Sequence, residues 1–247
     1  MSVPFLDPAL TTPLARLLEG LHDLGLAWVP SLVAVVVVLR LLQLPLTLHQ
    51  VRQQRARAAA RDDLRALAHR YRRRSDPASQ RRRLEEQRTV LRSHGVRSWG
   101  CLVLLLPVPL WLALYHLVSQ LAAGSVAAGV STAVVASFAG ATLAGVPLAA
   151  RGWSGDLTHL AVVLGLALTS AMLGFLTQRA AAAGTPLADD APAAVLHLQQ
   201  WLPAVSAVGV VAAAGAVPVA LLVCWVANAA WQALQQGVLT RASAAIS

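Results

Sequence analysis

Residues 31–48 read SLVAVVVVLRLLQLPLTL, an apolar run that is long enough to cross a bilayer and that carries Arg40 near its middle. At about 1.5 Å per residue of helix, Arg40 lies roughly 12 Å from the end of the run at Leu48. An arginine on an isolated span costs from about 3 to more than about 10 kcal/mol. We therefore expect Arg40 to face a wet cavity or a partner inside the protein. The alternative is that its side chain snorkels to the headgroups.

Two polar residues follow Arg40 at helical spacing. Gln43 and Thr47 lie three and seven positions after Arg40, so a helix places the three side chains on one face. Pro45 lacks a backbone donor and leaves the carbonyl one turn earlier without its usual partner, which a membrane tolerates only where another group satisfies it. The sequence predicts a polar face on this span and an apolar face opposite.

The composition is that of a polytopic membrane protein. The chain has 247 residues, of which 57% are hydrophobic and 13% are charged, and its net charge is +9. All 20 basic residues are arginine, and 15 of them lie between Arg52 and Arg97. No spacing typical of a metal site occurs, and we expect neither a metal nor a cofactor. No cleavable signal peptide is visible, so the first span is expected to insert as an uncleaved anchor.

The arginine-rich arm predicts the topology. Basic loops stay in the cytoplasm, which puts residues 49–98 and the C-terminus inside and the N-terminus outside. Asp76 or Ser75 can cap a second helix that begins at Pro77, so the arm is expected to form a helical hairpin. Such a basic hairpin suits anionic lipid headgroups or ribosomal RNA. The simpler alternative is that the arginines of this arm only determine the membrane topology and bind no partner.

The remaining segments follow from hydropathy, prolines and turn residues. Residues 1–27 are expected to form an external tail with an interfacial amphipathic helix, followed by Trp28 as an interface anchor. We predict an all-α polytopic membrane protein with five core transmembrane helices at 28–48, 99–121, 157–178, 198–217 and 218–239. The connecting segments are then the cytoplasmic hairpin 49–98, an external or peripheral segment 122–156, a cytoplasmic loop 179–197 and a cytoplasmic tail 240–247. Residues 122–150 are apolar enough for a sixth span, and charge barely distinguishes the two models.

An ordered series of short motifs resembles the YidC/Oxa/Alb family of membrane protein insertases, and within it the bacterial YidC-like proteins of actinobacterial type. The series extends over roughly residues 28–240, and its order is more specific than any single motif. It consists of RLLQLPLT from Arg40, Asp76-Pro77, HGV from His94, Gly100-Cys101, PLWLALY from Pro109, GVPL from Gly145, Thr177-Gln178, Gln200 with WLP from Trp201, VCW from Val223, and Gln235-Gln236.

The resemblance implies a groove inside the membrane that is open to the cytoplasm and to lipid. Arg40 would lie in this groove, Trp225 matches an aromatic groove position, and Gln178 matches a polar one. Two departures concern its chemistry. Pro107 replaces a usual glutamine, and the usual Ser-Asn pair of the last span is shifted, with Asn228 at the serine position and Ala229 at the asparagine position.

The resemblance implies a bacterial cytoplasmic-membrane insertase or chaperone, not an enzyme, that moves nascent transmembrane segments into the bilayer. Its expected partners are nascent membrane proteins, the ribosome, the Sec translocon and anionic lipids. We do not expect it to bind DNA, and we favour a monomer. A degenerate or specialised paralogue that acts as a folding chaperone or scaffold stays open. A small transporter is disfavoured, because no predicted span contains the acidic residue that coupled carriers usually need. No motif of a hydrolase or nucleotide-binding enzyme occurs.

Overall fold

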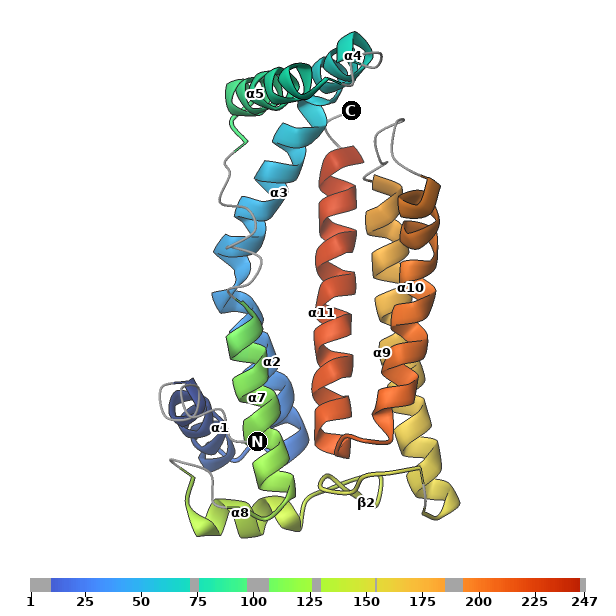
Figure 1. Cartoon of the computed structure of the whole chain (residues 1–247). Coiled ribbons are helices and arrows are strands. Elements are labelled where there is room, and N and C mark those ends of the chain that lie inside the picture. Colours follow the sequence, from blue (N-terminus) through green and yellow to red (C-terminus); the bar gives the residue numbers. More distant parts are fainter. Residues whose placement is uncertain are drawn as a thin grey trace. The chain divides into compact units, whose positions relative to one another are not determined.

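The computed structural model describes residues 10–71, 76–96, 107–125, 130–153, 155–184 and 193–244. These residues are mostly helical, which agrees with the expected all-α class (Figure 1). They divide into two compact units, one built from 1–41, 108–186 and 191–247 and the other from 42–107 with 187–190.

The first unit contains the helices that build the candidate site. Its elements are α1 (Thr12–Asp23), α2 (Trp28–Leu42), α7 (Pro107–Ala122), α8 (Thr132–Ala139), β1 (Thr142–Leu143), β2 (Val146–Pro147), α9 (Leu157–Gly184), α10 (Ala193–Ala214) and α11 (Val219–Ala244). The second unit contains α3 (Leu44–Ala59), α4 (Arg61–Tyr71) and α5 (Pro77–Ser93).

One apolar core joins most helices of the first unit. Helix α2 contributes Leu32, Val35 and Val36, which recur at helical spacing and are fully buried. Helix α7 adds Leu117 and α11 adds Leu222, both without exposed surface. Helices α9, α10 and α11 lie side by side, with α9 in contact with both of the others (Figure 1). This core fixes the positions of α2 and α11 along their axes. It thereby determines which polar side chains of the two helices can meet.

Trp28, which was expected at the membrane interface, is buried in this core; its depth in the bilayer stays a prediction. Its indole N–H donates to the Ser137 hydroxyl at 3.0 Å, and its ring meets Phe138 edge-on with centroids 5.2 Å apart. His22 stacks on the other side, 4.2 Å between centroids. Only 5% of Trp28 is exposed, because α1 and α8 cover it. Sequence alone cannot distinguish a tryptophan at a membrane surface from one under a short helix.

The segment 130–153 consists of short elements. Helix α8 has eight residues and so extends about 12 Å, less than half of a bilayer core. A two-residue hairpin follows, in which Ala144 and Gly145 both have positive φ, as a tight turn between antiparallel strands requires. The described part of this segment therefore contains no helix long enough to cross the membrane.

The residues after this hairpin hold the beginning of α11. The first N–H groups of a helix have no partner within the helix. Here the N–H of Val219 donates to the carbonyl of Ala150 and the N–H of Ala220 donates to the carbonyl of Leu148, each at 3.0 Å. The Gly145-Val-Pro-Leu148 motif thus fixes where α11 starts, and with it the positions of Trp225 and Asn228 farther along the helix.

The first predicted span is interrupted. Helix α2 ends at Leu42 and α3 begins at Leu44, with Gln43 between them, where a continuous segment over 28–48 was expected. Pro45 explains the break, because its ring has no N–H and clashes with the carbonyl one turn earlier. Helices α9 and α10 also extend into the expected loop 179–197, to Gly184 and from Ala193.

By length and apolarity, one described helix qualifies alone as a membrane span, residues Leu157–Ala182 of α9. Helices α2 and α3 qualify together as a second if they count as one interrupted span. In α10 the apolar stretch Gln200–Ala214 is shorter. The described part of α7 starts at Pro107, and Gly100-Cys101 lies outside the described residues. The count of five spans therefore stays a prediction.

In the second unit, α4 and α5 pack against each other. The Tyr71 hydroxyl donates to Glu86 at 2.7 Å, and Asp76 caps α5 by accepting from the N–H of Ser79 at 2.8 Å. Pro77 occupies the first turn, as expected; Ser75 lies outside the described residues. That this unit forms a cytoplasmic hairpin between two spans stays a prediction.

Gly215, between α10 and α11, provides a test of this fold. A Cβ at this position would overlap the indole of Trp153. We expect Gly215→Ala to lower the free energy of unfolding by about 1–3 kcal/mol, because a tight contact must open. Gly209→Ala in α10 is the matched control, since a Cβ there meets nothing within 4 Å. Thermal unfolding of the purified protein in detergent compares the two; equal stability would contradict the Gly215–Trp153 contact.

Candidate functional site

Arg40 lies near the end of α2 and is bound by a side chain of α11. Its Nε donates to the Asn228 Oδ1 at 2.7 Å, and its Nη2 donates to the same oxygen. Both N–H groups belong to the fixed fork of the guanidinium, so one amide oxygen determines the orientation of the whole group. Two residues 188 positions apart in the chain are thereby joined inside the first unit.

An aromatic ring holds the other side of the same guanidinium. The Cζ of Arg40 lies 5.2 Å from the centroid of the Trp111 ring on α7. This distance is within the range of a cation–π interaction, which strengthens when the pair is partly removed from water. Trp111 belongs to the PLWLALY motif, which the sequence analysis treated only as a marker of family resemblance.

The positive charge of Arg40 has no anionic partner among the described residues. Helices α2, α7, α9, α10 and α11 contain no aspartate or glutamate. The ion pairs of the described residues lie instead in the second unit, such as the 3.4 Å pair between Arg70 and Glu86. Arg40 is half-buried, so its charge is partly shielded from water without being neutralised.

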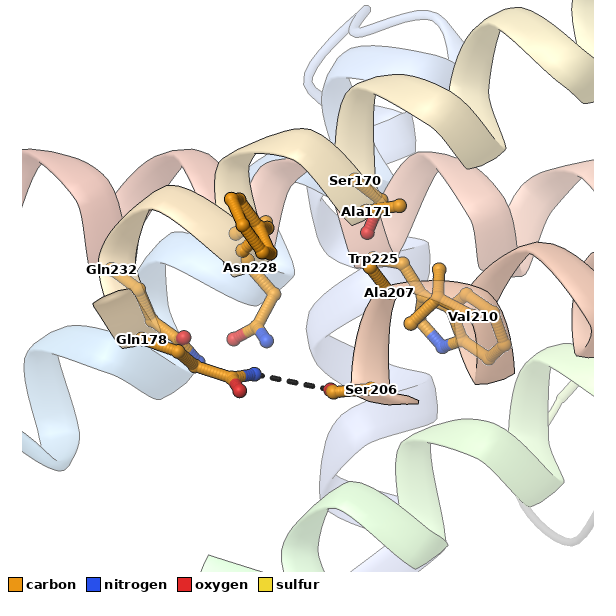
Figure 2. Close-up of a pocket in the computed structure, with 12 residues that line it drawn as sticks. Ser170, Ala171, Gln178, Ser206, Ala207, Val210, Trp225, Asn228 and Gln232 are labelled. Carbon is orange, nitrogen blue, oxygen red and sulfur yellow. Dashed lines mark hydrogen bonds between the residues drawn. The ribbon is translucent and has the colours of Figure 1, made fainter. Parts of the chain in front are cut away.

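Helices α9, α10 and α11 surround a pocket of about 250 Å³. Its polar lining consists of side chains from all three helices, namely Ser170, Gln178, Ser206, Asn228 and Gln232, with Trp225 as a large aromatic wall (Figure 2). The Gln178 amide donates to the Ser206 hydroxyl at 3.1 Å, which links α9 to α10 (Figure 2). Asn228 belongs both to the pocket wall and to the Arg40 contact.

This arrangement is suited to binding and not to bond cleavage. Amide and hydroxyl groups can donate and accept hydrogen bonds to a peptide, and the adjacent guanidinium attracts a carboxylate. Nucleophile, base and orienting group do not gather in the pocket lining. No cluster of three histidine, cysteine, aspartate or glutamate side chains able to hold a metal occurs among the described residues.

Three of the five predicted site residues come together. Gln178 and Trp225 line the pocket, and Arg40 reaches its wall through Asn228. Gln43 and Thr47 belong to the second unit. There the Thr47 hydroxyl donates to the carbonyl of Gln43 at 3.1 Å. Gln43 is 9% exposed, and its amide nitrogen has no hydrogen-bond partner among the described residues. Their role in a groove remains a prediction.

Sequence reasoning missed the partners of Arg40 and much of the pocket lining. Asn228 was noted only as a departure from a family motif, and Ser170, Ser206 and Gln232 were not selected. A signal was present, because each is a polar residue on a largely apolar helix. Spacing within one helix cannot show which polar residues of separate helices face the same space.

The chain is similar to known membrane proteins over most of its length. The family model described as 60Kd inner membrane protein matches residues 20–245. A "Membrane protein insertase YidC" of Streptomyces avermitilis is 28% identical over 130 residues, which are 52% of this chain and 29% of that protein. "Membrane protein insertase YidC 1" of Halalkalibacterium halodurans is 32% identical over 91 residues, 36% of this chain and 35% of the relative.

A third relative has a similar level of sequence identity to this chain. "Membrane protein insertase MisCA" of Bacillus subtilis is 28% identical over 118 residues, which are 47% of this chain and 45% of the relative. The chain thus matches less than half the length of each of these three relatives. Their names describe insertases and not enzymes.

The bond between α9 and α10 can be tested through Ser206. We expect Ser206→Ala to lower the free energy of unfolding by about 0.5–1.5 kcal/mol, because Gln178 loses its acceptor. Thr169→Ala is the control: the Thr169 hydroxyl donates to the carbonyl of Gly165 within the same helix, so it joins no two helices. Chemical or thermal unfolding in detergent measures both, and an equal loss in the two variants would speak against a link between the helices.

Proposed function

The chain belongs to the 60Kd inner membrane protein family, and on this premise we propose that it is a membrane protein insertase that moves nascent transmembrane segments into the bilayer. The observation that carries the proposal is the environment of the Arg40 side chain. Its guanidinium is held by Asn228 and Trp111 on helices that contain no acid, next to a polar pocket.

Arg40 would lower the barrier for a polar or acidic tail to enter the membrane. Two opposite charges 4 Å apart attract by about 1 kcal/mol in bulk water and by about 4 kcal/mol at the effective dielectric of a partly buried site. The hydroxyl and amide groups of the pocket would replace part of the tail's hydration. Together these terms offset the loss of water around the tail without nucleotide hydrolysis.

Release of the substrate would follow from its hydrophobicity. After the tail has crossed, the apolar span moves from a partly polar pocket into lipid, and each methylene that leaves water in this step gains about 0.8 kcal/mol. The outward residues of α10 are apolar and exposed, among them Val205 and Val208, as a lipid-facing helix requires. The proposed path therefore runs from the cytoplasmic side through the pocket into lipid.

Family membership supports a location in a bacterial membrane. We propose an orientation with the N-terminus outside and the C-terminus inside, because it puts the arginine-rich arm in the cytoplasm. Nascent membrane proteins would be its substrates. The ribosome and the Sec translocon are proposed partners of the same process, and the protein itself is proposed to be a monomer.

We also propose that α5 binds anionic lipid. Arg81, Arg88 and Arg92 recur at helical spacing and are exposed, and Leu84 lies in the same row with 55% of its surface exposed. A leucine among arginines suits the boundary between headgroups and acyl chains, where both kinds of side chain find a favourable environment. RNA phosphates would use the arginines but leave the leucine in water.

This lipid contact is testable with an environment-sensitive fluorophore on Leu84→Cys in the full chain, with the native cysteines replaced. In nanodiscs, phosphatidylglycerol should blue-shift its emission relative to phosphatidylcholine alone, because each arginine near an anionic surface contributes about 1 kcal/mol. Replacing Arg81, Arg88 and Arg92 by glutamine should remove the shift. The same change at Arg52, Arg55 and Arg57 on α3 is the control. Identical emission in the two lipids would refute the contact.

The insertase proposal is tested by complementation of a bacterial strain depleted of its own insertase. The intact chain should restore growth and insertion of a substrate with an acidic tail. Arg40→Ala should lower that insertion roughly tenfold, because the attraction is lost, and Arg40→Lys should retain much of it. Arg179→Ala is the matched control, since Arg179 is exposed and lies over Phe175 on the pocket wall.

Each outcome separates the candidate functions. Rescue by the intact chain and by Arg40→Ala alike would keep the insertase but remove the charge from its mechanism. If the intact chain reaches the membrane and fails to rescue, the insertase proposal is wrong, and the specialised scaffold or chaperone is favoured. The departures at Pro107 and Ala229 would then mark that specialisation.

A further inference from the structure

We propose that Asn228 is the positioning residue of Arg40, and that its neutrality keeps the full positive charge of Arg40 available to a substrate carboxylate. This inference rests on the proposed function and deepens it. It assigns to a residue of the last helix the control of both the orientation and the strength of the charge in the groove.

The geometry supports a positioning role. A guanidinium has five N–H donors, and Asn228 Oδ1 accepts one from Nε and one from Nη2. Two donors of one rigid, planar fork that meet at one oxygen fix the direction of the remaining three. Those three, on Nη1 and Nη2, have no hydrogen-bond partner among the described residues, and Trp111 lies over the guanidinium.

The chemistry of the acceptor decides how much charge remains. An aspartate has nearly the same shape as asparagine and would accept the same two hydrogen bonds, but it would form a bidentate ion pair with Arg40. The pair would be neutral overall, and a substrate carboxylate would gain little from it. Asparagine supplies the oxygen without the negative charge. The absence of acids from the surrounding helices serves the same end.

The place of Asn228 connects this charge to the pocket. Asn228 lines the pocket together with Gln178 and Gln232 (Figure 2), and its amide oxygen also accepts from the guanidinium of Arg40. A ligand in the pocket therefore meets the amide of Asn228 before it meets the charge. The polar side chains of the pocket wall are neutral, so Arg40 dominates the local potential. Arg179, over the Phe175 ring of the pocket wall, is exposed, so its charge is screened by solvent and salt.

Thiol modification measures this potential without requiring insertase activity. The intact chain, with Cys101 and Cys224 replaced by alanine and Ala207→Cys in the pocket wall, is reconstituted in nanodiscs. We compare its reaction rates with anionic sulfonatoethyl and cationic trimethylammonioethyl methanethiosulfonate. The anionic-to-cationic rate ratio should fall roughly fivefold to tenfold in Arg40→Ala and in Asn228→Asp alike. Arg179→Ala should change it less than about twofold.

A double-mutant cycle separates positioning from a general structural role. Asn228→Ala adds no charge, and it should lower the ratio roughly twofold to threefold because Arg40 is no longer held. In the Arg40→Ala background the same change should have no effect on the ratio. Thermal unfolding of each variant shows whether it folds. If Asn228→Asp does not fold, the comparison with Asn228→Ala still tests the inference.

Insertion then provides the second readout, with two substrates that differ only in an aspartate or an asparagine in the tail. The intact chain should insert the acidic tail better than the neutral one, and Asn228→Asp should abolish this preference. An unchanged rate ratio in both Arg40→Ala and Asn228→Asp, or an effect of Asn228→Ala that persists without Arg40, would overturn the inference. A normal pattern of rate ratios without any insertion would instead refute the proposed function alone.

Discussion

The structure of the first unit depends on the requirement that a guanidinium within apolar helices be satisfied without being neutralised. A charge taken out of water is costly unless hydrogen bonds or an opposite charge replace its hydration. Arg40 is satisfied by the amide oxygen of Asn228 and by the π-face of Trp111. Both partners are neutral, so the charge remains. These two contacts tie α2 to α11 and α7, and they leave the charge of Arg40 without an anionic partner among the described residues.

Other contacts in the first unit fix the positions of Arg40, Asn228 and Trp111 along the axes of their helices. The segment after the β1–β2 hairpin accepts the first N–H groups of α11, which fixes where that helix begins and how far along it Asn228 lies. The fully buried residues of α2, α7 and α11 form one core and exclude sliding of the helices past one another. Helices α9 and α10 complete the pocket wall, joined by the bond between Gln178 and Ser206.

The second unit obeys a different constraint. Its helices are rich in arginine and bury few side chains, such as Leu67 and Tyr71. Their local order comes from the Asp76 cap and from hydrogen bonds to Glu86. A surface of this kind gains little from an apolar core. Most of the described arginines of this unit are exposed, whereas Arg40 of the first unit is half-buried among helices without acids.

The sequence by itself determined the membrane class and the concentration of arginines in one arm, because hydropathy and charge act locally along the chain, and it singled out Arg40, whereas the break after Leu42 appeared only in the structure. The sequence also led to Gln178 and Trp225 through an ordered series of motifs. Only the tertiary structure decided that Asn228 and Trp111 are the partners of Arg40, that Trp28 lies under α1 and α8, and that Ser206 faces Gln178. These contacts join residues up to 188 positions apart, and helical periodicity specifies a face of a helix but not the helix that will meet it.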